Sequence, residues 1–476
     1  MLAKKNISFK MSLVPIIVLL AAGALSVFVW KVGMLLPLIS GIIVTALIGY
    51  YHGNSWGELE DGLTEGVSLA LQPVFILIIV GSIIGTWIAS GIIPSLIFYG
   101  LKIINPEFFL PLAAIITAVV STSTGTSFTS IATVGIALMA VGNGMGFAAP
   151  ITAAAVISGA FFGDKLSPLS DTTNVAPAIV KCDLFEHVGH MLWDTLPAFI
   201  LSLLLYYFAG INQLVEGSAG IAQINELTSG LANIFNISPI LLFVPLLTIV
   251  FAIKKIPAVP ALISVSFLGG IFAFIFQGAS VSKVLSAFTF GFKSNTGQQM
   301  LDSLLSRGGI TSMGSTIILL ITATALGGIM RKTGILDSIL NKFISLIKNK
   351  KQLGLAALIS SLLTGISTGA QFLAIIIPGS LFTPTYKKFN LHTKNLSRAV
   401  EAAGTVGITL VPWSVPAVFA ASTLGPDPAA FIPYLFFPML VILINVIYTI
   451  TGFTMVQAEE ETSEVGTQKE IKQSAE

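Results

Sequence analysis

The stretch from Gly163 to Asn174 reads GDKLSPLSDTTN and carries three charged residues directly after an uncharged run at 146–162. It lies in a strongly apolar chain, in which 54% of the 476 residues are hydrophobic and 10% are charged. The mean hydropathy is +0.91. This composition predicts an all-α protein that crosses a lipid bilayer many times. An ionisable group at membrane depth costs roughly 2.5 kcal/mol or more, so the stretch is predicted to carry function.

Apolar segments define the expected crossings, because a bilayer core of about 30 Å needs roughly 20 apolar residues per helix. Two apolar stretches, 108–141 and 354–385, are too long for one span and are interrupted by STSTGT at 121–126 and by TGISTG at 364–369. We interpret both as re-entrant hairpins with polar tips, which a protein interior or a wet cavity tolerates. The ten predicted crossings are 13–30, 34–51, 70–89, 146–178, 189–209, 238–253, 258–277, 310–330, 395–424 and 431–455.

Lysine and arginine residues orient these crossings. With the N-terminus in the cytoplasm, most basic residues fall inside, including the cluster at 342–351, whereas Lys283 falls outside. This asymmetry follows the positive-inside rule. The segment 212–238 has no lysine or arginine and is predicted to be external. The acidic end, 458–476, is interpreted as a cytoplasmic tail, which places both termini in the cytoplasm.

An internal repeat supports the same arrangement. Shifting the sequence by 244 residues aligns 113–176 with 357–420 without a gap and with fifteen identities. Each half then carries five crossings, an odd number, so we expect the second half to be inverted. Inverted repeats are typical of transporters whose discontinuous helices meet at a binding site near the midplane. The chain accordingly divides into a first repeat at 1–210, an external linker at 211–237, a second repeat at 238–457 and the tail at 458–476.

The two halves share their scaffold but not their charges. The hairpin tips correspond to each other, and so do the proline breaks at 167–168 and 412–416. The functional chemistry is therefore expected at the residues that differ. The charged residues have uncharged counterparts: Asp164 with Ile408, Lys165 with Thr409, Asp171 with Val415, and Glu401 with Ile157.

Asp171, just beyond the first proline break, is the preferred ligand for a metal cation, and Asp164 is the second. In a desolvated cavity, protonation and sodium binding compete for one carboxylate, and this competition alone produces antiport. The alternative for Asp171 is that it caps the helix beginning near Thr172. Neutral oxygen ligands are expected from the same stretch: Ser167, Ser170, Thr172, Thr173 and the amide of Asn174.

Lys165 and Glu401 each admit two interpretations. Lys165 neutralises Asp164 or Asp171 as an internal cation that sodium displaces, or it neutralises a buried carboxylate without further role. Glu401 follows Arg398 by three residues, which favours a surface ion pair over a proton relay.

The hydroxyl groups of the helix breaks are predicted to line the substrate site, namely Ser123, Thr124, Ser367, Thr368 and Ser414. Alternatively, the hairpin-tip hydroxyls bond to carbonyls of their own helices. Gln371 is a weaker candidate for the same site. Four histidines, His52, His187, His190 and His392, fall at predicted cytoplasmic ends, and we interpret them as solvated rather than as pH sensors.

The segment Ser158–Pro177, SGAFFGDKLSPLSDTTNVAP, resembles the signature of the NhaC family of bacterial sodium/proton antiporters. The resemblance implies exchange of Na⁺ for H⁺, a plasma-membrane location and membership in a superfamily with hairpin-containing inverted repeats. It also implies a homodimer in which a transport block, here roughly 91–178 and 335–424, moves like an elevator. No cofactor and no nucleic-acid partner are expected. The single cysteine, Cys182, excludes an internal disulfide.

Three alternative functions are disfavoured by the sequence. Some relatives of the family exchange malate and lactate together with protons and sodium, and Lys165 with the hairpin tips would then hold a carboxylate. Cation exchange is favoured because no arginine pair lies at membrane depth to clamp a dianion. A channel is disfavoured because an asymmetric inverted repeat suits alternating access. A hydrolase is disfavoured because no histidine is predicted at membrane depth.

Overall fold

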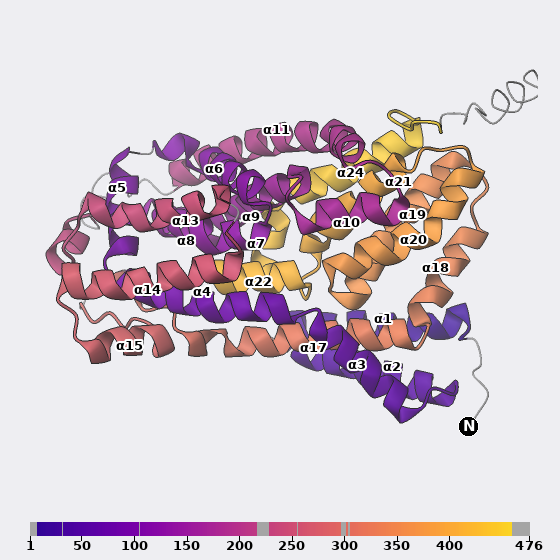
Figure 1. Cartoon of the computed structure of the whole chain (residues 1–476), viewed down its shortest axis with the longest axis horizontal. Coiled ribbons are helices and arrows are strands. Elements are labelled where there is room, and N and C mark those ends of the chain that lie inside the picture. The colour runs from indigo at the N-terminus through magenta and orange to yellow at the C-terminus, as the bar shows by residue number, and fades with distance from the viewer. Residues whose placement is uncertain are drawn as a thin grey trace, which may run out of the picture.

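A computed structural model describes residues 7–30, 32–103, 105–216, 228–254, 256–296, 301–302 and 305–458. Its regular elements are helices, with one isolated β-bridge between Leu391 and Gln457. Most helices run along the long axis of the molecule (Figure 1). The predicted tail at 459–476 and the middle of the predicted linker, 217–227, lie outside the described residues.

Six helical segments in the described part are long and apolar enough to cross a membrane, and three bent helix pairs raise the total to nine. Ten crossings were expected. The difference begins at the N-terminus, where α1 (Phe9–Ala24) and α2 (Leu35–Tyr51) have only 16 and 17 residues. The chain is therefore a helical, multi-span membrane protein. The six segments are α4 (Leu71–Ala89), Pro106–Thr124, Ser127–Gly144, Leu184–Gln213 within α11 (Leu184–Glu216), Val259–Gln277 within α14 (Ala258–Gln277), and Ile310–Lys332, which ends with α17 (Gly314–Lys332).

Each of the three bent pairs consists of two helical arms. Thr228–Ile234 meets Pro239–Thr248 at 100°, and α13 (Phe243–Ile253) begins in the second arm. Lys394–Leu410 meets α22 (Val415–Leu424) at 45°, and Pro428–Tyr434 meets α24 (Phe436–Thr451) at 56°.

Four shorter helices were not predicted: α3 (Trp56–Ser68), α5 (Ile92–Ile103), α15 (Val281–Phe290) and α18 (Ile335–Ser345). With 10 to 13 residues, they are too short to span a bilayer. The best defined is α3, which starts with a capping box between Ser55 and Glu58. A Cβ atom on Gly66 would lie 2.2 Å from the Thr324 carbonyl oxygen, so α3 packs backbone to backbone on α17.

The long apolar stretch 108–141 is broken at Gly125, whose φ of +68° is in the left-handed region. Helix α6 (Phe109–Thr124) ends there, and the chain resumes as α7 (Ser127–Ser130), a π-helical turn (Ile131–Gly135) and α8 (Ile136–Gly144). Glycine suits this position because it carries no Cβ atom. Each arm of this break is long enough to cross a membrane, so re-entry of the arms stays a prediction.

The second break repeats this geometry. Helix α19 (Lys350–Thr368) ends at Gly369, with a φ of +65°, and α20 (Gln371–Lys388) follows. Both breaks fall in the polar tips that the sequence indicated, at positions separated by the repeat shift. The proline breaks also interrupt helices: α9 (Ala149–Leu166) is followed by α10 (Asp171–Val180), and a 3₁₀ turn (Gly407–Leu410) by α22.

Each glycine break packs against the proline break of its own half. A Cβ atom on Gly125 would lie 2.6 Å from the backbone carbon of Leu169. In the second half, the Val415 amide donates to the Gly369 carbonyl oxygen at 2.8 Å. The two breaks in each half therefore form one compact unit.

In each half, a side chain of the proline break donates a hydrogen bond to a carbonyl oxygen near the glycine break. The Ser167 hydroxyl donates to the Thr122 carbonyl oxygen at 2.8 Å, and the Trp413 indole donates to the Ile366 carbonyl oxygen at the same distance. Thr122 and Ile366 are equivalent in the repeat. The geometry of the breaks is thus kept although the side chains differ.

The last described residues, 453–458, form a C-terminal strap across the start of α21 (Lys394–Glu401). Asn395 donates to the Val456 carbonyl oxygen at 2.7 Å and accepts from the Val456 amide at 3.0 Å. Arg398 donates to the Thr454 hydroxyl at 2.6 Å. The start of α1 and the end of α24 both lie at the right-hand end of the molecule in Figure 1.

Candidate cation-binding cavity

A cavity of about 510 Å³ lies where the four helix breaks converge, and α4, α13 and α14 close its other side. Both glycine breaks and both proline breaks contribute to its wall. The sequence predicted this convergence from the paired breaks. The lining residues with polar side chains are Gln72, Thr124, Thr126, Ser127, Thr129, Thr133, Asp164, Ser170, Asp171, Thr172, Thr248 and Gln371.

The charged side chains that line the cavity are acidic. Among the described residues, the cavity lining contains two carboxylates, Asp164 and Asp171, and no lysine, arginine or histidine. Aromatic and aliphatic side chains, including Phe128, complete the wall. A cavity with only acidic charged groups favours cations over anions.

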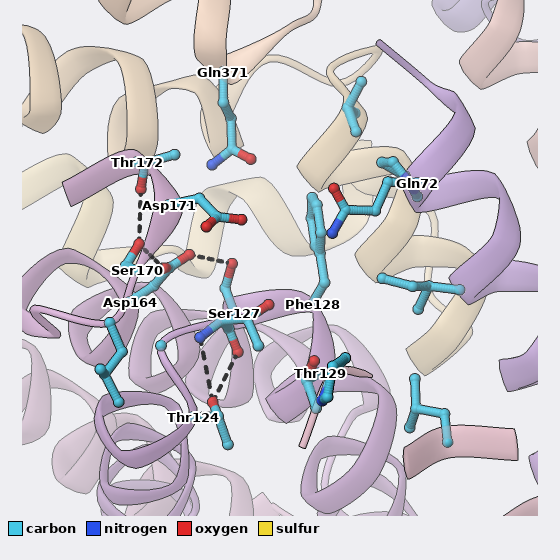
Figure 2. A pocket seen from close by; sticks show the side chains of 18 of the residues that line it. Gln72, Thr124, Ser127, Phe128, Thr129, Asp164, Ser170, Asp171, Thr172 and Gln371 are labelled. Carbon is cyan, nitrogen blue, oxygen red and sulfur yellow. Dashed lines mark hydrogen bonds between the residues drawn. The ribbon is translucent and has the colours of Figure 1, made fainter. Parts of the chain in front are cut away.

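Asp164 belongs to the last turn of α9, and its side chain is 6% exposed. Ser127 donates to one carboxylate oxygen at 2.6 Å, and Ser170 donates to the other at 2.5 Å (Figure 2). These donors come from the first hairpin and from the proline break. Close packing of Gly163 on the Ala118 carbonyl brings α9 near enough to α6 for this contact.

Asp171 is exposed and points into the cavity between Gln371, Ser127 and Phe128 (Figure 2). It is the first residue of α10, while Ser170 occupies the capping position. The alternative role of Asp171 as the cap is therefore wrong, since the helix begins one residue earlier than expected. Within the described part of the chain, the Asp171 carboxylate makes no hydrogen bond.

The other predicted ligands divide into two groups. Ser170 and Thr172 line the cavity, and their hydroxyl oxygens lie 3.1 Å apart. Ser167, Thr173 and Asn174 do not line it, because each donates to backbone carbonyls of the proline break or the adjacent hairpin. These three side chains fix the shape of the break.

The predicted hydroxyls of the hairpin tips also divide. Thr124 lines the cavity. Ser123, Ser367 and Thr368 donate to carbonyls one turn earlier in their own helices, at 2.8, 2.7 and 2.7 Å. Ser414 accepts from the Ala417 amide and so caps α22. The alternative of back-bonding therefore describes most of these residues.

Two carboxamide side chains face the cavity from opposite sides, Gln371 after the second break and Gln72 in the first turn of α4 (Figure 2). Gln371 also donates to the Thr405 carbonyl oxygen at 3.2 Å. Sequence reasoning missed Gln72, which stands near the start of a predicted crossing and resembles an interfacial residue there.

Lys165 turns away from the cavity and is fully buried. Its ammonium group lies 3.0 and 2.9 Å from the two carboxylate oxygens of Asp194 on α11, and it donates to Thr195 at 2.7 Å. Asn445 on α24 donates to the same carboxylate at 2.7 Å. Of the two interpretations of Lys165, neutralisation of a separate buried carboxylate describes this contact, and Asp194 was missed.

Glu401 does not form the predicted surface pair with Arg398. Its side chain is fully buried, and its Oε1 accepts from Thr405 at 2.8 Å. Arg398 is 2% exposed and bonds to Thr454 instead. The i,i+3 interpretation is wrong, because the helix directs the arginine toward the C-terminal strap and the glutamate toward α9.

Two of the four histidines are also buried, against the expectation of solvation. His187 and His190 are 0% and 6% exposed. His187 lies 2.7 Å from the Ser397 hydroxyl through its Nδ1 atom. His52 and His392 remain nearer the surface, and His392 lies 3.7 Å from Glu186. The burial arises because α21 packs over the start of α11.

Many apolar helices surround this polar cavity and a set of buried charges, and these features define a membrane transporter rather than an enzyme. Comparison with known proteins agrees. The sequence model of the Na⁺/H⁺ antiporter family matches residues 3–173 and 159–453. The chain belongs to the NhaC family of Na⁺/H⁺ antiporters, which confirms the resemblance of the segment 158–177.

Three relatives cover most of the chain. The Na⁺/H⁺ antiporter NhaC of Alkalihalophilus pseudofirmus is 38% identical over 91% of this chain and 94% of its own length. NhaC of Bacillus subtilis is 34% identical over 93% of this chain and 99% of its own length. The malate-2H⁺/Na⁺-lactate antiporter of Bacillus subtilis is 34% identical over 86% of this chain and 87% of its own length.

Proposed function

We propose that this protein exchanges sodium ions for protons across the plasma membrane by alternating access. The observation that carries the proposal is the cavity at the four helix breaks, whose described lining residues include two carboxylates and no basic side chain. Asp164 and Asp171 would bind the sodium ion, with the hydroxyls of Ser127 and Ser170 as neutral ligands. In such transporters, the substrate and ion sites lie where discontinuous helices meet.

A second candidate is exchange of small organic acids coupled to sodium and protons. It has support from the cavity volume of about 510 Å³, which is within the usual range for small-molecule sites. The name of the malate/lactate relative points the same way. The charges disfavour it, because an organic anion would meet Asp164 and Asp171 while Lys165 is engaged with Asp194.

The transport cycle is proposed to use the internal repeat. The two halves, 1–210 and 238–457, would be inverted relative to each other, with the external linker between them. The block formed by 91–178 and 335–424 would move against the remaining helices, in an elevator-like manner and within a homodimer. The compact packing of each glycine break on its proline break supports movement of these elements as units. Both termini would face the cytoplasm, which the common end of the α1 start and the α24 end in Figure 1 favours.

Reconstituted protein tests the function directly. We would purify the protein, incorporate it into liposomes and record internal pH after adding sodium, first alone and then with malate or lactate. Sodium alone is expected to drive proton movement. A response that requires the organic acid would instead establish the second candidate.

A further inference from the structure

The buried charged side chains of the described residues gather in one place. They lie on α9, α11 and α21, beside the cavity but outside its lining except for Asp164. Electrostatic interactions connect them, because Lys165 interacts with Asp194, Glu401 and Arg398, and Glu401 interacts with Asp164. We call this set the buried charge cluster. Its members are Asp164, Lys165, His187, His190, Asp194, Arg398 and Glu401.

The charges of this cluster do not balance. Lys165 is bound by both oxygens of Asp194 and offsets that carboxylate. Arg398 supplies one further positive charge, whereas Asp164 and Glu401 supply two negative charges when both are ionised. With both histidines neutral, the cluster then has one negative charge in excess. An uncompensated buried charge is strongly unfavourable, so the cluster requires one additional cation.

Glu401 offers a place for a proton. Its Oε1 accepts from Thr405, but its Oε2 has no hydrogen-bond partner in the described part of the chain, although the side chain is 0% exposed. Buried polar atoms without a partner are uncommon and call for an explanation. A proton on Oε2 would remove the excess charge of the cluster.

A path for this proton leads to the cavity. Thr172 faces the Glu401 carboxyl group and also lines the cavity, where its hydroxyl lies 3.1 Å from that of Ser170. Glu401 itself does not line the cavity. It is therefore one side chain removed from water and from the proposed sodium site.

We propose that Glu401 is the proton-carrying residue of the exchange cycle, and that a proton on Glu401 and a sodium ion at Asp164 are alternative ways to neutralise the buried charge cluster. This inference rests on the proposed sodium/proton exchange. When sodium binds at Asp164, the O–H bond at Oε2 breaks and the proton passes to cavity water beside Thr172. When sodium leaves, a proton from water returns to the same oxygen. The charge of the cluster is equal in both states.

Groups on several neighbouring elements surround Glu401. Helix α9 contributes Asp164 and Lys165, α10 contributes Thr172, and Thr405 lies on the following π-helical turn. Arg398 lies on the same helix as Glu401, with Tyr386 of α20 close to it. Helix α11 contributes the remaining members of the cluster, His187, His190 and Asp194. Of the charged groups among these, Asp164 lines the cavity, which links sodium binding to the charge on Glu401.

The test separates proton coupling from sodium movement. Glu401→Gln resembles the protonated residue permanently and leaves Asp164 and Asp171 intact. In proteoliposomes, sodium-driven proton movement is expected to fall about tenfold or more. Because the glutamine mimics the protonated residue, sodium should bind more weakly, so counterflow of radioactive sodium at equal pH is expected to continue at saturating sodium but with a raised half-saturation concentration. Proton movement at the wild-type rate, or loss of both activities, would overturn the inference.

Glu401→Asp provides a second variant that keeps a carboxyl group. It is expected to restore proton movement with a pH profile displaced from that of the wild type. An unchanged pH profile would contradict the inference, even if Glu401→Gln failed to fold. A third measurement uses protein in detergent: sodium addition should release protons from the wild type and should release few from Glu401→Gln.

Glu186→Gln is a matched control, because it makes the same change at a carboxylate that is 48% exposed near the start of α11. Both activities are expected to remain at wild-type levels in this variant. The wild-type protein distinguishes failure of the proposed sodium/proton exchange from failure of the proposed role of Glu401. If it moved no protons in response to sodium, the proposed function would fail, whereas an active wild type with an equally active Glu401→Gln would refute only the role of Glu401.

Discussion

The ammonium group of Lys165 lies within 3.0 Å of both carboxylate oxygens of Asp194, and neither side chain is exposed. This pair joins α9 to α11, and Asn445 extends it to α24. The last turn of α9 also presents Asp164 to the cavity. Lys165 therefore acts on the proposed cation site by positioning the helix that carries Asp164.

Lys165→Met is expected to destabilise the protein, because it leaves Asp194 buried without its cation. Removing one partner of a buried ion pair typically costs about 3–5 kcal/mol. Thermal unfolding in detergent should show the loss, and replacing Asp194 by leucine in the same protein should recover part of it. Glu65→Gln is the control, because Glu65 pairs with Arg331 and Lys332 at a half-exposed position. Equal shifts in the two single variants would contradict the prediction.

Asp171→Asn is expected to abolish sodium-driven proton movement while leaving stability nearly unchanged. The side chain is exposed to the cavity and makes no hydrogen bond within the described residues, so its replacement should change the free energy of unfolding by less than about 0.5 kcal/mol. Proteoliposome assays and thermal unfolding measure the two effects. Full exchange by this variant would show that Asp171 is not a sodium ligand.

Gly125→Ala is expected to impair both folding and transport. A left-handed conformation costs a non-glycine residue about 1–2 kcal/mol. The new Cβ atom would also meet the backbone of Leu169 at 2.6 Å. Gly146→Ala is the control, because Gly146 has a φ of +83° but no atom within 4 Å of an added Cβ. The loss of thermal stability should be clearly greater for Gly125→Ala than for Gly146→Ala. Equal losses would contradict the prediction, because they would mean that the Leu169 backbone moves away from the added Cβ atom at little cost.

Cysteine labelling tests the predicted orientation. On a Cys182→Ser background, Lys283→Cys should react with a membrane-impermeant maleimide from outside, whereas Lys350→Cys should react only after the membrane is opened. Lys283 is exposed and Lys350 is partly exposed in the structure. Burial raises the pKa of the Cys182 thiol, but its removal avoids any background labelling. The reverse pattern would refute the topology and, with it, the inverted repeat.

The helix breaks were predictable because their signals are local. A glycine beside serine and threonine in an apolar stretch indicates a break, and the repeat places Gly125 and Gly369 at equivalent positions. The partner of Lys165 was not predictable in this way. Neighbouring residues on a helix point in different directions, so only the packing of α9 on α11 selects Asp194. A lone aspartate within a predicted crossing was nevertheless a usable signal.

The roles of the hydroxyl groups in the charged stretch could not be predicted either, because they too depend on packing. Motif reasoning assigned every oxygen of the charged stretch to a ligand, but broken helices also leave carbonyls that need donors. Ser167, Thr173 and Asn174 satisfy such carbonyls. Ser170 and Thr172 remain directed toward the cavity. Which hydroxyl performs which task depends on the path of the backbone around Pro168, and composition does not contain that information.

The C-terminal strap decides where the protein can be modified for purification and labelling. An affinity tag joined after Ala458 would leave the bonds of Asn395 to Val456 and of Arg398 to Thr454 in place. Deletion from residue 453 onward would remove them all and release the helix that ends at Glu401. A shortened protein used for crystallisation or for fluorescent fusions would thus differ from the natural chain at the helix that carries the proposed proton site.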